Sequence, residues 1–224
     1  MTDSSPQSHL RDKLYAHLEQ IYPQRELSRL VELLIELMEL DQRCFMPEAH
    51  KNLWDERDCL MIAYGDSLQR EGEWPLHTLH DFLRRECRGV ISGVHILPFY
   101  PWSSDDGFAV INYVEVNPSL GEWQDINAIS RDFDVMADLV INHCSSRSQW
   151  FENYKQRRHP GKDYFVEGDP QWDLSAVVRP RTSDLLAEGQ TLDGKRHVWC
   201  PFSHDQVDLN FRNPEVLLEF VRII

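Results

Sequence analysis

Three short apolar runs, separated by segments of helical periodicity, most constrain the fold of this chain. They are residues 59–64 (CLMIAY), 90–97 (VISGVHIL) and 135–141 (VMADLVI). Continuous apolar runs of this length are typical of strands buried on both faces of a parallel sheet. One helix is expected from Pro75 to Gly89 and another over residues 122–131. This order of elements predicts an α/β fold with right-handed crossovers.

Polar and aromatic residues follow the second and third runs directly. They form the segments 95–108 (HILPFYPWSSDDGF) and 138–143 (DLVINH). The carboxyl ends of parallel strands meet at one edge of a sheet, where such folds bind their ligands. We therefore expect the functional groups of the two segments to converge at that edge.

The sequence on either side of the three runs predicts further elements. Residues 9–40 carry two apolar stripes of helical spacing, separated by Pro23, and residues 41–56 indicate a linker. Residues 144–205 are rich in charged residues, Pro, Gly, Trp and Tyr but have no clear helical period. So long an excursion indicates an inserted subdomain. A last helix is expected to start at 213–215 (NPE), where Asn caps the helix and Pro occupies its first turn.

Composition excludes several classes of function. The formal net charge is -14, from 23 Lys and Arg against 37 Asp and Glu, so we expect no nucleic-acid partner. No apolar stretch reaches the ~18 residues of a membrane span, and no signal peptide is apparent, so we expect no membrane partner. Five scattered cysteines without a CxxC pattern suit reduced thiols in the cytoplasm. The sequence also lacks HExxH and a glycine-rich phosphate loop, and we expect no metal.

The chain resembles the α-amylase superfamily of retaining glycoside-active enzymes. Residues 138–143 are similar to its D-x-x-x-N-H signature at the end of the third barrel strand. Three segments resemble the sucrose phosphorylase-like subfamily: 103–108 (SSDDGF), 173–181 (DLSAVVRPR) and 198–211 (VWCPFSHDQVDLNF). Residues 1–50 resemble the helical extension of the branch acting on glucosylglycerate or sucrose 6'-phosphate. Val178, where sucrose phosphorylases carry a tyrosine, favours the same branch.

The resemblance implies an incomplete (β/α)8 TIM barrel, of which this chain holds about the first three strands. The implied domains are an N-terminal helical extension (1–53), the first part of the barrel (54–143), an inserted subdomain (144–205), and a return segment with a barrel helix (206–224). The implied activity is retaining transfer of an α-glucosyl group from sucrose, sucrose 6'-phosphate or glucosylglycerate to phosphate, giving α-glucose 1-phosphate. Such a glycosyltransferase needs a sugar and inorganic phosphate as substrates, but no cofactor.

The resemblance also assigns substrate-binding roles to five residues. The family uses the equivalent of His143 to hydrogen-bond a glucose hydroxyl, and Asp105 and Phe108 to line the glucose site. Arg181 is expected near the phosphate or acceptor, because a guanidinium fork suits an oxyanion, and Gln206 on the acceptor side. Taken alone, these residue types have plainer readings as a core histidine, a polar turn and a solvated surface arginine.

Several nearby residues are treated differently. Weaker candidates for the same site are Tyr64, Asp66, Asp106 and Arg179. Asp138 lies five residues before His143, and an odd offset along a strand places it on the opposite face. We therefore expect Asp138 to make a structural hydrogen bond outside the sugar pocket.

The catalytic carboxylates of the family follow the fourth, fifth and seventh barrel strands, and the resemblance places all three after Ile224. We therefore expect the chain by itself to be inactive. We also expect an unpaired edge on the third strand, a last helix with no sheet to cover, and a tendency to aggregate. Two alternatives stay open: a hydrolase or transglycosidase of the same superfamily, and a non-catalytic sugar-binding remnant.

Overall fold

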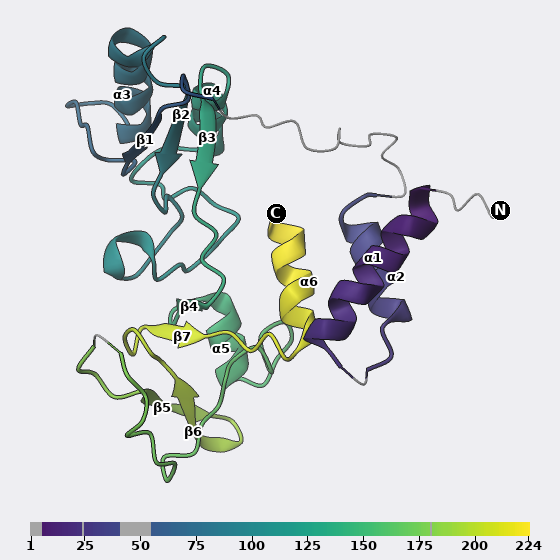
Figure 1. The fold of residues 1–224 in the computed structure, drawn as a ribbon. Helices are drawn as coiled ribbons and strands as arrows, with labels where there is room; N and C mark the ends of the chain where they lie inside the picture. Colours follow the sequence, from purple (N-terminus) through teal and green to yellow (C-terminus); the bar gives the residue numbers. More distant parts are fainter. Residues whose placement is uncertain (1–5, 24, 41–54, 180) are drawn as a thin grey trace, which may run out of the picture. The chain divides into compact units, whose positions relative to one another are not determined.

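A computed structural model describes residues 6–23, 25–40, 55–179 and 181–224 (Figure 1). The chain divides into two compact units, one formed by residues 1–51 with 210–224 and the other by residues 52–209. Each unit is described by itself. No helix in the described part of the chain has the length and apolar character needed to cross a membrane.

The first unit is helical and consists of α1 (Pro6–Ile21), α2 (Ser28–Leu37) and α6 (Pro214–Ile223). The two helices predicted before residue 40 are therefore confirmed. So is the predicted start of the last helix, because the Asn213 side chain accepts a hydrogen bond from the Glu215 backbone N–H and Pro214 occupies the first turn.

The last helix has an apolar partner surface that was not expected. Its buried residue Leu218 belongs to a core shared with α1, α2 and the turn between them: Leu18, Tyr22, Leu27, Leu30, Val31, Leu34, Ile35 and Leu218. This helix was expected to have no sheet to cover, and in the described part of the chain it packs on helices instead. Its apolar face packs on the N-terminal helices, which bury it as a sheet would.

The second unit contains the predicted parallel sheet. Its strands are β1 (Leu60–Ala63), β2 (Gly93–Ile96) and β3 (Asp134–Ala137), in the order β1-β2-β3. Ile62, His95 and Met136 share one register position across the sheet. The crossovers contain α3 (Pro75–Phe82), which continues as a π-helical turn (Leu83–Cys87), and α4 (Trp123–Ser130). The α/β fold with its strand–helix alternation is confirmed.

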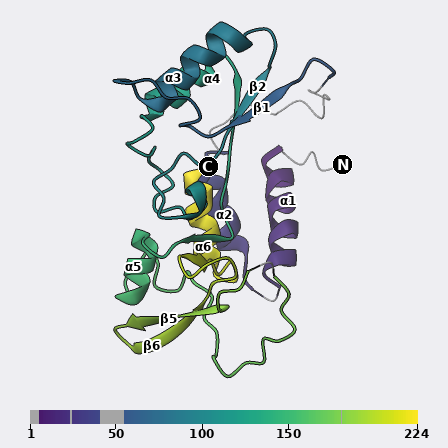
Figure 2. The ribbon, with the colours of Figure 1, turned by 90° about the vertical axis from the view of Figure 1, so that its left-hand side faces the viewer.

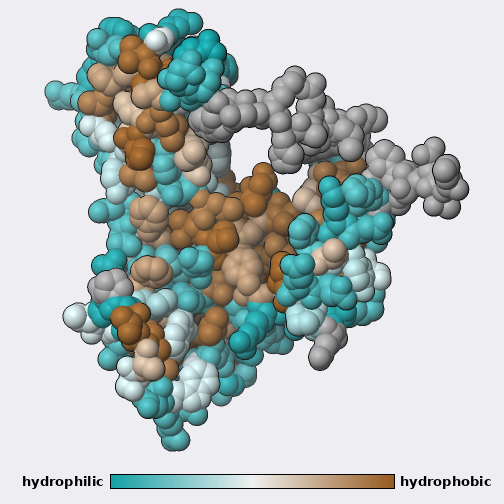
Figure 3. Space-filling view, in the orientation of Figure 1, coloured by the Kyte–Doolittle hydropathy of each residue, from teal (hydrophilic) through white to brown (hydrophobic). Residues whose placement is uncertain are grey.

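Within the second unit, helices cover only one face of the sheet. Helices α3 and α4 lie on one side of it (Figures 1 and 2), where Val94 and Ile96 of β2 are fully buried. On the other side, Ile62 is 63% exposed and Met136 42% exposed, and hydrophobic residues gather on the surface there (Figure 3). The prediction that all three strands are buried on both faces is therefore wrong for β1 and β3, because no described element covers this second face.

The third strand is shorter than predicted, and this changes the position of the DLVINH segment. β3 ends at Ala137, residues 138–142 are irregular, and His143 begins a new strand, β4 (His143–Ser145). β4 pairs antiparallel with β7 (Gln206–Asp208). His143 therefore does not end a strand of the parallel sheet. A separate strand pair holds it instead.

Regular structure also occurs within residues 144–205, where no helical period is visible in the sequence. Helix α5 (Gln149–Lys155) begins after Ser148, whose side chain accepts a hydrogen bond from the Phe151 backbone N–H. The strands β5 (Leu186–Thr191) and β6 (Gly194–Trp199) form an antiparallel hairpin. Phe151, Tyr154 and Phe165 pack with ring centroids 5.0–5.4 Å apart. Seven residues of helix are too few to show a period, and aromatic packing stabilises this one.

Candidate functional site

The pairing of β4 with β7 brings His143 and Gln206 together. The register pairs His143 with Asp208 and Ser145 with Gln206. Opposite residues, and residues two apart, share a face of a strand pair, so His143 and Gln206 point to the same side. Gln206 Nε2 lies 3.1 Å from His143 Nε2. Both residues are buried, with exposed fractions of 2% and 6%.

One nitrogen of the His143 imidazole makes hydrogen-bond contacts, and the other is buried without a partner among the described residues. Nε2 lies 3.0 Å from the carbonyl oxygen of Phe108, an acceptor, and close to the Gln206 amide, a donor. The ring satisfies one of them at a time: it donates to Phe108 with the proton on Nε2, or accepts from Gln206 with the proton on Nδ1. Nδ1 is buried and has no partner among the described residues.

Burial keeps the His143 ring neutral. Desolvation lowers the pKa of His143 below its ordinary value, although the Phe108 carbonyl and the charge of Asp105 partly oppose this shift. The ordinary pKa of histidine is already below 7, so the ring is uncharged at neutral pH. It acts there as a hydrogen-bonding group and not as a cation.

A tight left-handed turn presents Asp105. Backbone φ angles are positive at Asp105 (57°), Asp106 (50°) and Gly107 (107°). Gly107 is required here, because a Cβ atom would come 2.7 Å from the carbonyl oxygen of Pro98. The turn directs a carboxylate oxygen of Asp105 to 2.9 Å from Gln206 Nε2, which donates to it. The loop after β2 thus carries Ser103, Asp105 and Phe108, and Gly107 sets its geometry.

The structure brings four of the five predicted site residues into one cluster. Gln206 contacts Asp105 and His143, and His143 contacts the Phe108 backbone. The Gln206 amide is oriented by Ser203, whose hydroxyl donates to Gln206 Oε1 at 3.0 Å. The segments that contribute these residues are far apart in the sequence, and one glutamine side chain links them.

The fifth residue, Arg181, lies outside this cluster. Its side chain is exposed, and it forms no hydrogen bond or ion pair within the described part of the chain. The neighbouring Arg179 is engaged, since its Nη1 donates to the Pro201 carbonyl oxygen at 2.8 Å. Arg179 therefore holds the chain in place, and a role for Arg181 stays a prediction.

Two aromatic residues support His143 that the sequence did not single out. The Phe202 ring lies 5.0 Å from the imidazole, centroid to centroid. The Tyr113 hydroxyl donates to the carbonyl oxygens of Val140 and His143 at 2.9 and 3.0 Å. Burial raises the pKa of Tyr113 well above its ordinary value, so the hydroxyl stays a donor. Phe202 lies within the segment 198–211 that resembles the family, but no local pattern marks its contact with His143.

Asp138 makes the hydrogen bond predicted for it, with a residue that is not part of this cluster. It accepts from His95 Nε2 at 2.9 Å, and its position outside the sugar pocket stays a prediction. The argument from strand alternation is wrong, because Asp138 follows the end of β3 and shares no strand with His143.

A hollow of about 310 Å³ lies at the carboxyl ends of β1 and β2. Its lining includes Tyr64, Asp66, Trp102 and Asp106. Tyr64 and Asp66 were expected to contribute at this edge. Asp106 belongs to the turn that presents Asp105, so the hollow adjoins the cluster through that turn.

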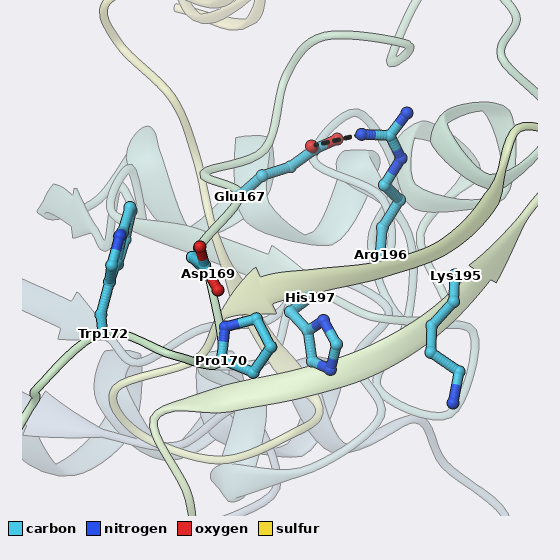
Figure 4. Close-up of a pocket in the computed structure, with 8 residues that line it drawn as sticks. Glu167, Asp169, Pro170, Trp172, Lys195, Arg196 and His197 are labelled. Carbon is cyan, nitrogen blue, oxygen red and sulfur yellow. Dashed lines mark hydrogen bonds and ion pairs between the residues drawn. The ribbon is translucent and has the colours of Figure 1, made fainter.

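A second hollow of about 350 Å³ lies over the β5–β6 hairpin (Figure 4). Its wall includes Trp172 and three consecutive basic residues, of which Arg196 faces the Glu167 carboxylate at 3.4 Å. Lys195 pairs with Glu188 at 2.9 Å. Both cations are therefore paired with carboxylates from residues 167 and 188. Among the described residues, no group of three or more His, Cys, Asp and Glu side chains could hold a metal ion.

The sequence of residues 89–224 matches the profile of the alpha amylase catalytic domain. The chain belongs to the alpha-amylase family. Two solved structures of similar fold agree with this assignment. A sucrose 6F-phosphate phosphorylase from Thermoanaerobacter thermosaccharolyticum is 32% identical, with a TM-score of 0.63 over 75% of this chain and 36% of that one. The trehalulose synthase MutB from Pseudomonas mesoacidophila shows the same fold at 22% identity and a TM-score of 0.62, covering 78% and 33% of the two chains.

Relatives within the alpha-amylase family confirm the resemblance to the sucrose phosphorylase-like subfamily. The chain is 46% identical to a glucosylglycerate phosphorylase from Allomeiothermus silvanus, over 99% of this chain and 39% of that protein. It is 43% identical to one from Escherichia coli, over 96% and 38% of the two chains. A sucrose 6(F)-phosphate phosphorylase from Thermoanaerobacterium thermosaccharolyticum is 41% identical, over 72% and 35%. The chain spans about two fifths of the length of these relatives.

Proposed function

We propose that this chain carries part of the glucose-binding site of a retaining glucoside phosphorylase. The reaction is transfer of an α-glucosyl group from glucosylglycerate, sucrose 6'-phosphate or sucrose to inorganic phosphate, which gives α-glucose 1-phosphate. The observation that carries the proposal is the Gln206 side chain, which lies within 3.1 Å of His143 and donates to Asp105 at 2.9 Å. A sugar ring needs several such groups at once.

The chemistry of the cluster suits a glucose ring. The exposed Asp105 carboxylate is an acceptor for two vicinal hydroxyls, and the neutral His143 ring lies beside it through the Gln206 amide. The rings of Phe108 and Phe202 are apolar surfaces for the sugar's C–H face. Because His143 is neutral, it binds a hydroxyl without placing a positive charge beside the developing oxocarbenium ion.

The exposed second face of the sheet supports a larger architecture. We assign β1 to β3 to the first part of a (β/α)8 barrel and residues 144–205 to an inserted subdomain. In a barrel, the face with Ile62 and Met136 becomes interior, which accounts for apolar side chains there. The nucleophile aspartate, the acid/base glutamate and the stabilising aspartate are assigned to sequence after Ile224. The protein is then a cytoplasmic enzyme with no cofactor.

The substrate branch follows from residues of the inserted subdomain. Val178 is almost fully exposed and offers no aromatic ring to a sucrose substrate. Arg181 is exposed and has no partner among the described residues, so it is available for phosphate or for an anionic acceptor such as glycerate. We therefore place the two anionic donors, glucosylglycerate and sucrose 6'-phosphate, ahead of sucrose.

The proposal is tested with the gene product that extends past codon 224. Release of glucose 1-phosphate should require both glucosylglycerate and phosphate, and Asp105→Asn should abolish it. Asp184→Asn, a matched change at an exposed carboxylate, should leave it unaltered. Phosphate-independent release of glucose would instead indicate a hydrolase or transglycosidase. The 224-residue chain alone should release no glucose 1-phosphate but should bind glucose.

A further inference from the structure

Asp205 joins three parts of the second unit through serine hydroxyls. Ser103 and Ser104 each donate to its Oδ2 atom at 2.5 Å, and Ser146 donates to Oδ1 at 2.6 Å. Because Ser103 uses its proton on Asp205, Ser145 is the donor in their 2.5 Å contact. Hydrogen bonds to a carboxylate are among the stronger ones in proteins. Three of them hold the Asp205 side chain and the segments that carry the serines in one arrangement.

Asp205 and its serine partners are direct sequence neighbours of candidate-site residues in both of the segments that meet here. Asp205 precedes Gln206 in the chain, and Ser104 precedes Asp105. Two adjacent residues therefore bind two adjacent residues: Asp205 holds Ser104, and Gln206 holds Asp105. The segments are about a hundred positions apart in the sequence, and the double contact fixes how they align.

The turn that Asp205 holds is strained. Asp105 and Asp106 both adopt positive φ angles, which L-residues adopt only at an energetic cost. A strained turn persists only when its surroundings hold it. Backbone hydrogen bonds within the loop and the Gln206 amide restrain this turn. The two serines that precede Asp105 add a further restraint, because both donate to the Asp205 carboxylate.

The charge state of Asp205 is consistent with this role. Burial by itself raises the pKa of Asp205. The hydrogen bonds from Ser103, Ser104 and Ser146, with the charge of Arg147, outweigh it, so the pKa lies below its ordinary value. The side chain is therefore an ionised, purely accepting group at neutral pH, as three donors require.

We propose that Asp205 is a positioning residue: it holds Ser103 and Ser104 so that Asp105 and Gln206 stay against His143. It touches no sugar in this arrangement. That the positioned residues bind a sugar rests on the proposed function, but their positioning can be measured without a sugar.

The test measures how fast diethyl pyrocarbonate modifies His143, by mass spectrometry of tryptic peptides. Residues 132–147 form a peptide with His143 as its one histidine, and residues 89–131 form a peptide with His95 as its one histidine. His95 serves as the internal control, because its partner is Asp138, outside the cluster. Asp205→Ala should raise the His143 rate about tenfold, as expected for loss of charged hydrogen bonds, and leave the His95 rate unchanged.

Two further variants keep the result decisive. Asp205→Asn retains one accepting oxygen, so it should give an intermediate rate, and Asp184→Asn should have no effect. If Asp205→Ala raises both histidine rates, the variant has unfolded, and Ser104→Ala decides instead. That change removes one hydrogen bond and should raise the His143 rate alone. An unchanged His143 rate in Asp205→Ala, or in Ser104→Ala where that variant decides, overturns the proposal.

Added glucose separates this proposal from the proposed function. In the wild-type protein, glucose should slow modification of His143, and Asp205→Ala should need about ten times more glucose for the same protection. If glucose gives no protection but Asp205→Ala still accelerates modification of His143 alone, the sugar site is refuted and the positioning role stands. If glucose protects both proteins at the same concentration, the positioning role is refuted and the sugar site stands.

Discussion

Gln206 donates a hydrogen bond to Asp105 at 2.9 Å, although 101 positions separate the two residues in the sequence. One residue opens β7, and the other lies on the loop that follows β2. The same amide nitrogen lies beside His143. A single side chain therefore contacts both the loop and the β4 strand from the return segment.

Replacing Gln206 should break its contacts with Asp105 and His143. We expect Gln206→Ala to weaken glucose binding about tenfold, or ~1.4 kcal/mol, because Asp105 loses its donor and the His143 ring loses a neighbour. Gln206→Glu should weaken it further, since a second carboxylate would face Asp105. Isothermal titration calorimetry measures both. Gln190→Ala, on the exposed hairpin, is the matched control, and equal affinities for it and Gln206→Ala would contradict the prediction.

Gly107 should tolerate no side chain. We expect Gly107→Ala to lower the free energy of unfolding by about 2–3 kcal/mol, because φ is +107° and the new Cβ would clash with the Pro98 carbonyl oxygen. Urea denaturation measures the loss. Gly189→Ala introduces the same methyl group where no atom lies within 4 Å, and it should cost well under half as much.

Asp208 should make stability depend on pH. Burial raises the pKa of Asp208 to about 7, and its buried Oδ1 has no hydrogen-bond partner among the described residues. The folded state thus binds the proton more tightly than the unfolded state, whose carboxyl titrates near pH 4. The contribution to stability is complete below about pH 4 and declines as pH rises to about 7.

Asp208→Asn removes this dependence, because asparagine resembles the protonated acid at every pH. We expect the variant to match the wild type near pH 4 and to exceed it near pH 8. Because solvent screens this half-buried carboxylate, the expected excess is about 2 kcal/mol, roughly half of what the full shift would give. Urea denaturation across this range is the measurement. A constant difference between the two proteins would show that Asp208 is not desolvated.

The open face of the sheet should make the chain self-associate. Ile62 and Met136 lie in the same register position on either side of β2, and both are exposed. We expect the double change Ile62→Lys with Met136→Lys to reduce light scattering and the binding of an apolar dye. Val90→Lys replaces an even more exposed residue outside the strands and should change neither signal. Equal effects of the double change and of Val90→Lys would show that self-association does not depend on this face of the sheet.

Local patterns predicted the elements that depend on local burial. The apolar runs around Ile62, Val94 and Val135 indicated three parallel strands, and Asn213 with Pro214 marked the start of the last helix. These signals are readable because a strand or helix must present an apolar face or a capping group within a few residues of itself. The family motifs added Asp105, Phe108, His143 and Gln206 as candidates.

The tertiary structure alone decided which distant segments meet. The β4–β7 register, the serine contacts of Asp205, the packing of α6 on the N-terminal helices and the one-sided burial of the sheet left no periodic trace in the sequence. The physical reason is that each depends on the path of the chain across 60 to 200 residues. The local sequence around a histidine or glutamine does not show whether its strand ends a barrel sheet or pairs with a return segment.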